Sequence, residues 1–542
     1  MPIAAPSRVL RRAAAIAALV ALVAGGVMML RAHRHRAAPR LPPGLLVLRV
    51  TDGPGGPPIG SRVLLFDSAG APVRIGRIDF NGKRQALGSC AIAPGVAGTW
   101  DGLVLAYGVA EIPIGADDCE PSPAIPHGRY RIWAWRGIEY EIWKGEVDLT
   151  GSARTALVIP LERAWTPHGT LAADLHVHAQ GSEDARTPNR LRVMSQVAAG
   201  VQVIGLSDHN RSGDLDAEIH ELGLDATVAS IACNEITGVV AHLGVYPVPV
   251  DRRSPRGPLP DDEAVYAATP DQLFDYAEAF PGDPIIQVNH PRFRYAALFD
   301  SARWDGTSWP PPFPLRFDAV EILSGHTSFN DAGDRRIDEA IRDFYTLVDH
   351  GVVVTALGNS DTHHLNGVRD ALSRNYVFVD DPTVARFDEA GFVAAIRAHR
   401  VVTTTGPWLD VEVASRDRGA TVGPGQLVVA DGGAVWVDLE LAQASFVAAD
   451  RIRIVVGGPA GPAVARTLDV PAGERHFRWR GRVDVGAADT WLGVDAGGDT
   501  PLPVELTGSY FAEKGHRGAT PHALVNPIRV DADGDGRWAR RR

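Results

Sequence analysis

Hydrophobic and polar positions follow two different patterns along this chain. Between residues 45 and 165, short apolar runs such as LLVLRV and SRVLLFD are separated by turns rich in glycine and proline. The same character returns in residues 408–542, for example in AVWVDLELA and DRIRIVVGG. Neither region sustains a helical period, so we expect a β-sandwich-like domain in each.

The middle block, residues 166–407, alternates apolar runs with stretches of helical period. The segment TPNRLRVMSQVAAG predicts a helix with Thr187 as its cap and Pro188 at its first position. TPDQLFDYAEAF repeats this signal, and DRRIDEAIRDFYTLVDHG predicts a helix that ends at Gly351. Strands that alternate with helices predict a parallel sheet, which we expect to close into an α/β barrel.

The seven apolar runs of the middle block carry ionisable residues, most of them at the end of the run. These residues are His176 and His178, Asp208 and His209, Glu235, His242, His290, His326, and Asp361 with His363 and His364. Alternate residues of a strand point to the same face, so the two histidines of DLHVHA can reach one ion. The C-terminal ends of barrel strands meet at one mouth. The pattern therefore predicts a single metal-binding cluster, although most individual histidines in proteins are structural.

Composition supports this prediction and narrows the alternatives. Eleven of the 18 histidines fall between His168 and His364, where an even spread would place roughly six or seven. The formal charge of −11 argues against a general nucleic-acid binder, because no net basic surface is available to displace counterions. Three cysteines cannot form a disulfide framework. Cys90 and Cys119 suit one bridge in an oxidising compartment, whereas Cys233 lies in an apolar run and is predicted to be a buried thiol.

The N-terminal region predicts a membrane segment. A basic tail, residues 1–12, precedes 18 uncharged residues, 13–30, and a proline-rich linker, residues 31–44, follows. A helix of that length reaches about 27 Å, close to the hydrocarbon thickness of a bilayer. No small-x-small cleavage site follows, which favours a retained anchor over a cleaved signal. Arginines flank both sides, so the positive-inside rule leaves the orientation open. We expect a membrane-anchored or exported protein, periplasmic or extracellular.

The ordered motifs DLHVHA, GLSDHN, ACNEIT, VVAHLG, VNHP and NSDTHH resemble those of the polymerase and histidinol phosphatase (PHP) superfamily. TTTGPWL and the later NPIRVDADGDG are similar to its carbaryl-hydrolase-like branch. The resemblance covers residues 166–408 well and the flanking regions loosely. It implies a distorted seven-stranded (β/α) barrel with two or three divalent metal ions.

The resemblance also implies how the ligands are shared. One ion would be held by His176, His178, Glu235 and Asp361; a second by Glu235, His242 and His290, with Glu235 bridging; and a third by His209 and His363. Many members have a further histidine where this chain offers Glu183 and Asp184, and we favour Asp184 as the replacement. Asp208 adjoins His209 and would face the opposite way along a strand. We therefore expect Asp208 to orient the ring of a ligand histidine instead of binding a metal ion itself.

Mixed imidazole and carboxylate ligands suit Zn²⁺, Mn²⁺ or Fe²⁺ better than Ca²⁺. Two such ions lower the pKa of water from about 15.7 toward 7 and polarise a substrate oxygen. The resemblance implies hydrolysis of a phosphate mono- or diester by metal-bound hydroxide. Arg292 and Arg294 are candidate clamps for an anionic group, and His326 and His364 are candidate proton donors. As single residues, all four also fit plain structural roles.

Two alternatives remain open at this stage. The same metals suit hydrolysis of a carbamate, ester or amide, with a small-molecule instead of a phosphorylated substrate. The chain also suits a catalytically silent metal- or glycan-binding envelope protein, with GRYRIWAWRG and RHFRWRG as aromatic glycan-binding faces. Their alternation equally predicts core and surface positions of sandwich strands. The segment from Asp531 to Gly536 predicts an exposed Asp-Gly turn, because Arg542 stands where a calcium loop needs glutamate.

Overall fold

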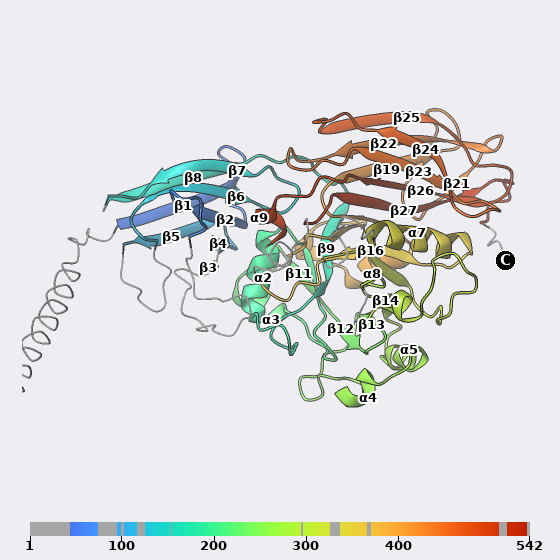
Figure 1. The fold of residues 1–542 in the computed structure, drawn as a ribbon, viewed down its shortest axis with the longest axis horizontal. Coiled ribbons are helices and arrows are strands. Elements are labelled where there is room, and N and C mark those ends of the chain that lie inside the picture. Colours follow the sequence, from blue (N-terminus) through green and yellow to red (C-terminus); the bar gives the residue numbers. More distant parts are fainter. Residues whose placement is uncertain are drawn as a thin grey trace, which may run out of the picture.

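The computed structural model describes residues 44–73, 95–98, 102–115, 125–151, 153–293, 296–325, 336–365, 370–508 and 518–538. The N-terminal strands lie beside a central block of strands and helices, and the C-terminal strands lie above that block (Figure 1). The predicted membrane segment, residues 13–30, and both Cys90 and Cys119 fall outside the described ranges. Within those ranges, no helix is both long and apolar enough to cross a membrane.

The N-terminal part consists of two sheets that enclose one core. One sheet has the order β5-β1-β8, formed by β5 (Val109–Ile114), β1 (Gly44–Asp52) and β8 (Arg154–Leu161). The other has the order β3-β4-β2-β6-β7, formed by β3 (Val96–Gly98), β4 (Gly102–Leu105), β2 (Ser61–Phe66), β6 (Arg129–Trp135) and β7 (Trp143–Asp148). Alternate residues such as Leu46, Leu48, Ile112 and Ile132 fill the space between the sheets, as the period of two predicts.

The central block contains strands at all seven predicted apolar runs. They are β9 (Thr170–Val177), β10 (Val203–Leu206), β11 (Ala229–Ala232) continued by β12 (Asn234–Thr237), β13 (His242–Tyr246), β14 (Ile285–Val288), β15 (Ala319–Ser324) and β16 (Thr355–Asn359). Two more strands follow, β17 (Arg374–Phe378) and β18 (Val401–Thr404). The intervening helices are α2 (Asn189–Ala198), α3 (Asp216–Glu221), α4 (Asp262–Tyr266), α5 (Pro270–Glu278), α6 (Leu298–Ser301), α7 (Arg336–Asp349), η1 (Val384–Arg386) and α8 (Glu389–Arg397).

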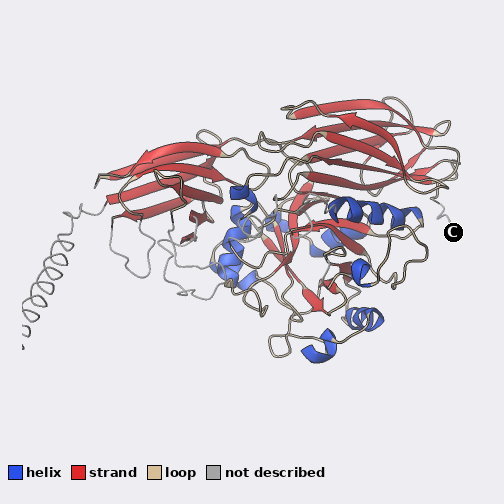
Figure 2. Ribbon diagram, in the orientation of Figure 1, coloured by secondary structure: helices blue, strands red, loops and turns tan. Residues whose placement is uncertain are grey.

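The prediction of a closed (β/α) barrel is wrong. Strands make up 39% of the structure and helices 15%, and within the described ranges the strands form five separate sheets without a closed barrel (Figure 2). Strands β9–β11 belong to a ten-stranded sheet of order β11-β10-β9-β17-β18-β27-β26-β23-β24, with β21 beside β27. Strands β12–β16 form a separate five-stranded sheet in chain order.

Two local features depart from the predicted parallel barrel. Residues 238–241 are the only link between β12 and β13, and four residues cannot make the crossover that parallel strands need, so the pair is antiparallel. Strand β17 pairs with residues 170–173 of β9 and occupies the edge that a closing strand would use. Between β9 and the end of β16, the ladder is reduced to an isolated bridge from Val177 to Thr362.

The helix ends confirm one predicted cap and correct another. Thr269 caps α5 and forms a capping box with Gln272. Thr187 does not cap α2, because its hydroxyl donates instead to the carbonyl of His363. Helix α7 ends at Asp349, and Gly351 follows with a φ of 77°. The correction matters for function, since Thr187 ties the start of α2 to the loop after β16.

The C-terminal part shares a sheet with the central block. Its elements are β19 (Trp408–Ala414), β20 (Thr421–Val422), β21 (Leu427–Val429), β22 (Ala434–Ala442), β23 (Arg451–Val456), β24 (Ala463–Asp469), β25 (His476–Asp484), β26 (Thr490–Gly497), α9 (Val504–Thr507) and β27 (His522–Asp531). Strand β27 pairs with β18, so the ten-stranded sheet continues across residue 407. The four-stranded sheet β20-β19-β22-β25 covers it, and a large apolar core lies between them.

The aromatic runs occupy ordinary sandwich positions. In β25, Phe477 and Trp479 pack against the core, whereas Arg478 on the opposite face pairs with Glu440. In β6, Trp135 is buried and Trp133 is covered by the ammonium of Lys144 at 3.9 Å. This arrangement matches alternating core and surface residues. Near the C-terminus, the carboxylate of Asp531 accepts the backbone N–H groups of Gly534 and Gly536, which closes the predicted turn.

Candidate metal centre

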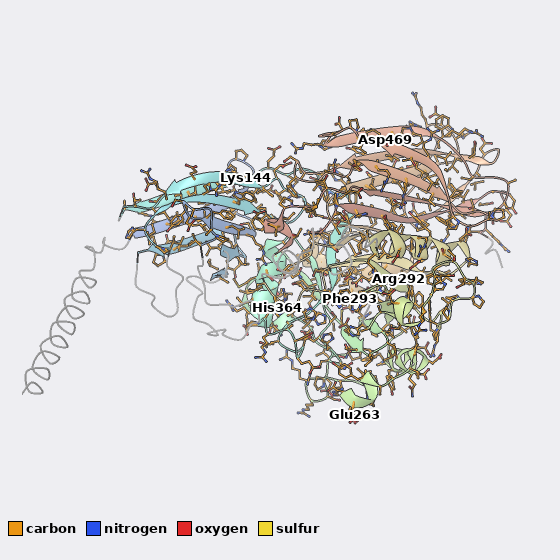
Figure 3. All side chains as sticks on the ribbon, in the orientation of Figure 1. Lys144, Glu263, Arg292, Phe293, His364 and Asp469 are labelled. Carbon is orange, nitrogen blue, oxygen red and sulfur yellow. The ribbon has the colours of Figure 1, made fainter. Side chains whose placement is uncertain are left out.

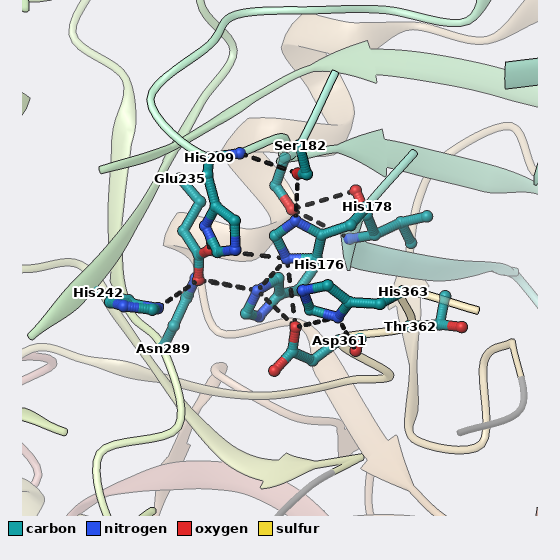
Figure 4. Close-up of polar contacts among 12 residues, drawn as sticks. His176, His178, Ser182, His209, Glu235, His242, Asn289, Asp361, Thr362 and His363 are labelled. Carbon is teal, nitrogen blue, oxygen red and sulfur yellow. Dashed lines mark hydrogen bonds and ion pairs between the residues drawn. The ribbon is translucent and has the colours of Figure 1, made fainter. Parts of the chain in front are cut away.

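Six histidines and three acids converge at one edge of the central strands. Figure 4 shows most of them around His176 and Glu235. They are His176, His178, His209, His242, His290, His363, Asp184, Glu235 and Asp361. Most of them stand at or beyond the C-terminal end of a strand. His242 instead begins β13, whose antiparallel direction brings its first residue to the same edge. The candidate ligands predicted from sequence are therefore brought together.

The His-x-His pair of β9 lies at the buried end of the cluster. Both side chains are fully buried, and their Nε2 atoms are 3.1 Å apart. Two nitrogens bound to one zinc ion in tetrahedral geometry would lie about 3.3 Å apart. Asp361 Oδ1 is 3.2 Å from each of these nitrogens. The three side chains thus present converging donor atoms, as the alternation of a strand predicts for residues 176 and 178.

Glu235 occupies the centre of the cluster and is fully buried. Its Oε1 lies 2.9 Å from His176 Nε2, 3.3 Å from His242 Nδ1 and 3.7 Å from His290 Nε2. Its Oε2 lies 2.7 Å from His209 Nδ1 and 3.6 Å from His178 Nε2. A carboxylate with imidazoles on both oxygens is in the position that a bridging ligand requires.

Asp184 faces the third group of histidines. Its Oδ2 is 3.3 Å from His209 Nε2 and 3.3 Å from His363 Nε2. Glu183, the alternative considered from sequence, turns away and accepts the hydroxyl of Tyr266 at 2.9 Å. Of the two acids, Asp184 is therefore the one that lies beside the imidazoles.

Two of the candidate ligands have unusual backbone conformations. His290 has a φ of 27° and Asp361 a φ of 50°, in the left-handed region that non-glycine residues rarely adopt. The backbone N–H of Asp361 donates to the carbonyl of His176, and that of His290 donates to Glu321. Strained residues persist where their surroundings hold them, and they concentrate at functional sites.

The predicted catalytic residues differ in how they contact the cluster. Asp208 reaches the cluster through Ser182, whose hydroxyl donates to Asp208 and lies 2.8 Å from His178 Nδ1. This supports its predicted orienting role. Arg292 is buried, and its guanidinium pairs with Asp343 of α7 at 2.6 Å and with Asp300 at 3.1 Å (Figure 3). These contacts favour a structural role. His326 and Arg294 lie outside the described residues, and His364 follows the candidate ligand His363.

Sequence reasoning missed three buried residues beside the ligands. Asn289 donates its amide to Glu235 Oε1 at 2.7 Å. Ser182 connects Asp208 to His178, as described above. Glu321 contacts His176 Nδ1 at 3.1 Å. The only sequence signals are a polar residue just before His290 and a lone acid inside the apolar run AVEILS.

Opposing charges perturb the pKa values of the cluster. Burial alone would raise the pKa of Glu235, but His176, His242 and His209 outweigh it and hold that pKa well below its usual range. Burial favours neutral His176, yet Asp361, Glu235 and Glu321 raise its pKa well above the usual value. Burial, helped by His363 and His209, lowers the pKa of His178. Burial also lowers the pKa of His242. Neutral imidazoles and ionised carboxylates are the forms that bind metals.

The polar atoms of the cluster fit a metal better than a hydrogen-bond network. Glu235 Oε2, His242 Nδ1 and His290 Nδ1 are buried and have no hydrogen-bond partner among the described residues. Glu235 Oε2 is close to His209 Nδ1, but that nitrogen is aligned with the hydroxyl of Thr237 instead. Such groups are costly to bury unless something else satisfies them. The side chains form four overlapping groups of three, and within each group the donor atoms lie within 4.8 Å of one another.

Exposure increases from one side of the cluster to the other. His176, His178 and Glu235 are fully buried, whereas the side chains of His209, His242 and His363 are 11%, 16% and 17% exposed and that of Asp184 is 55% exposed. The cluster is therefore open to solvent on the Asp184 side.

A scan against known protein families finds no match for this chain, and a search of curated proteins finds none either.

Proposed function

We propose that this chain is a metal-dependent hydrolase related to the PHP superfamily, and that its substrate is a phosphate mono- or diester. The observation that carries the proposal is the convergence of six imidazoles and three carboxylates on a site that is buried on one side and open on the other. The ordered motifs of the sequence support the choice of phosphoester chemistry.

The residues present would hold two or three ions. His176, His178, Glu235 and Asp361 fit one set; Glu235, His242 and His290 a second; and His209, His363 and Asp184 a third. Divalent ions of the zinc, manganese or iron type would there lower the pKa of a water and polarise the substrate oxygen. No nucleophilic side chain is needed for that chemistry.

The chain itself orients the ligands and shapes the site. Asn289 fixes Glu235, and Asp208 fixes His178 through Ser182. On the face of these strands turned away from the cluster, Leu243, Val288 and Ile322 are buried in an apolar core, so the sheet that carries the site is covered on its far side. Substrate binds on the exposed side, beside Asp184 and His363, and the preorganised groups limit the rearrangement needed during reaction.

The test uses the full chain purified without added metal, then loaded with Zn²⁺, Mn²⁺ or Fe²⁺. Each form is assayed on p-nitrophenyl phosphate, bis(p-nitrophenyl) phosphate, p-nitrophenyl acetate and a p-nitrophenyl carbamate, and bound metal is quantified. We expect at least two ions per chain and metal-dependent release of nitrophenol from one or both phosphate esters. Turnover of the acetate or carbamate alone would overturn the phosphoester assignment. Stoichiometric metal without turnover of any of the four would overturn the hydrolase assignment.

A further inference from the structure

Glu321 is a buried acid that the chemistry described above does not use. It lies in β15 among the buried residues Val320, Ile322 and Leu323, and none of its side chain is exposed. A carboxylate in such a place is costly unless its oxygens are satisfied and its charge is compensated. Its contacts therefore show what keeps it there.

Both oxygens of Glu321 accept hydrogen bonds from the candidate metal centre or the strand beside it. Oε1 lies 3.1 Å from His176 Nδ1 and accepts the amide of Asn359 at 3.0 Å. Oε2 accepts the backbone N–H of His290 at 2.8 Å. One side chain thus joins β15 to β9, to β16 and to the segment after β14.

The contact with His176 fixes which ring nitrogen faces the cluster. A carboxylate only accepts hydrogen bonds, so the hydrogen of a neutral His176 belongs on Nδ1. Its Nε2 then presents a lone pair toward His178 Nε2 and Glu235 Oε1, at 3.1 Å and 2.9 Å. The contact with His290 acts on the backbone, because it holds the N–H of a residue in a strained conformation with a φ of 27°.

The carboxylate of Glu321 has no lysine or arginine beside it among the described residues. Its ion-pair contact is with His176. Buried charges are paired or stand near bound metals. A divalent cation on the other nitrogen of His176 would compensate this carboxylate through the ring, in the manner of a carboxylate–histidine–metal arrangement.

We propose that Glu321 is a positioning residue of the metal centre, which sets the tautomer of His176 and holds the backbone of His290 so that both imidazoles reach their ions. This inference rests on the proposed metal-dependent function. It assigns a role to a residue that does not itself bind metal or substrate.

The test compares Glu321→Gln with Glu139→Gln in the full chain. Glutamine has one acceptor oxygen, so it cannot accept from both His176 and His290. Glu139 is the control, because it is likewise a buried glutamate whose carboxylate accepts a hydrogen bond. Its donor is the hydroxyl of Tyr376 at 2.8 Å, and it touches no candidate ligand. The readouts are the dissociation constants for Zn²⁺ and Co²⁺, measured against a chelator, and the visible spectrum of the cobalt-loaded chain.

We expect Glu321→Gln to weaken metal binding about 10- to 100-fold and to change the cobalt spectrum, as changes behind a ligand generally do. Glu321→Asp, which keeps two acceptor oxygens, should fall between Glu321→Gln and the wild type. Glu139→Gln should leave both readouts unchanged. A Glu321→Gln chain with wild-type affinity and spectrum would overturn the proposal. If the wild type itself binds no metal, the proposed function fails, which is a different result.

A second measurement covers the case in which Glu321→Gln does not fold. Nitrogen-15 NMR of the wild-type chain loaded with ¹¹³Cd²⁺ should show His176 with its hydrogen on Nδ1 and cadmium coupling at Nε2. The signal is assigned by its absence in His176→Gln. Cadmium coupling at Nδ1, or a hydrogen on Nε2, would overturn the assigned role.

Discussion

Replacing Glu235 by glutamine is the most informative single change in the cluster. The two side chains have nearly the same volume, so the substitution leaves the packing around a fully buried position intact, while it removes the charge and replaces one oxygen by an NH₂ group. That charge lies within 2.9 Å of His176 Nε2 on one oxygen and within 2.7 Å of His209 Nδ1 on the other. Under the proposed bridging role, the substitution should therefore affect more than one ion at once.

The size of the effect follows from these contacts. Substitutions that disturb only the residues behind a ligand cost about 10- to 100-fold in metal affinity. Removing the charge of a ligand should cost at least about 100-fold, or about 2.7 kcal/mol, for each ion that it touches. The same amount of metal-dependent stabilisation should disappear at a fixed concentration of free metal.

The assay has three parts: bound metal per chain, thermal midpoint with and without metal, and turnover. We expect Glu235→Gln to lose at least one ion, to show a smaller metal-induced rise in midpoint, and to lose turnover. Glu139→Gln, a buried glutamate outside the cluster, serves as the control and should retain all three properties. Wild-type stoichiometry and turnover in Glu235→Gln would refute the bridging assignment.

Three further predictions concern residues other than Glu235. Asp184→Asn should weaken binding of the third ion about 10-fold or more, because Asp184 Oδ2 faces both His209 and His363. Glu183→Gln should leave that affinity unchanged, since Glu183 turns toward Tyr266, and equal metal titrations of the two variants would contradict this prediction. Burial, with Arg529, lowers the pKa of His399 from 6.5 to about 4. Neutral His399 therefore contributes about 3 kcal/mol to the free energy of unfolding above pH 6.5, and this contribution is lost as the pH falls through 4. His399→Asn keeps a residue type that tolerates the φ of 60° and should lack this loss in unfolding free energy between pH 6.5 and 4; the same acid dependence in both chains would argue against it. Cys233→Ser should retain metal and turnover while losing about 1–3 kcal/mol of stability to a buried hydroxyl, and a loss of metal content would show that the thiol contributes to the site.

The strands of the central block could be predicted from sequence, but their connectivity could not. Apolar runs determine where β9 to β16 form, because burial of a strand is a local property of its residues. Whether two strands run parallel depends on the link between them and on which other strand takes the free edge. The tight link between β12 and β13 and the pairing of β17 with β9 decide this. The short link can be read from the sequence, whereas the pattern of alternating strands and helices gives no sign of the pairing of β17 with β9.

The candidate ligands follow the same division between local and long-range information. His176 and His178 share a face because they belong to one strand, so their convergence is predictable from spacing alone. Arg292 stands two positions after His290, yet its guanidinium is held by Asp343, 51 residues away. The sequence gives no sign of a role for Glu321, because its contact with His176 depends on the fold that brings β15 and β9 to the same site. Contacts between distant segments decide both cases.

Anomalous X-ray diffraction from crystals of the metal-loaded full chain tests the central claim most directly. Data collected on both sides of the zinc or manganese absorption edge should show at least two peaks bordered by His176, Glu235 and Asp361. Crystals soaked or grown with excess metal that show no anomalous peak among these side chains, or peaks only at surface groups such as Asp489 and Asp533, would contradict the account.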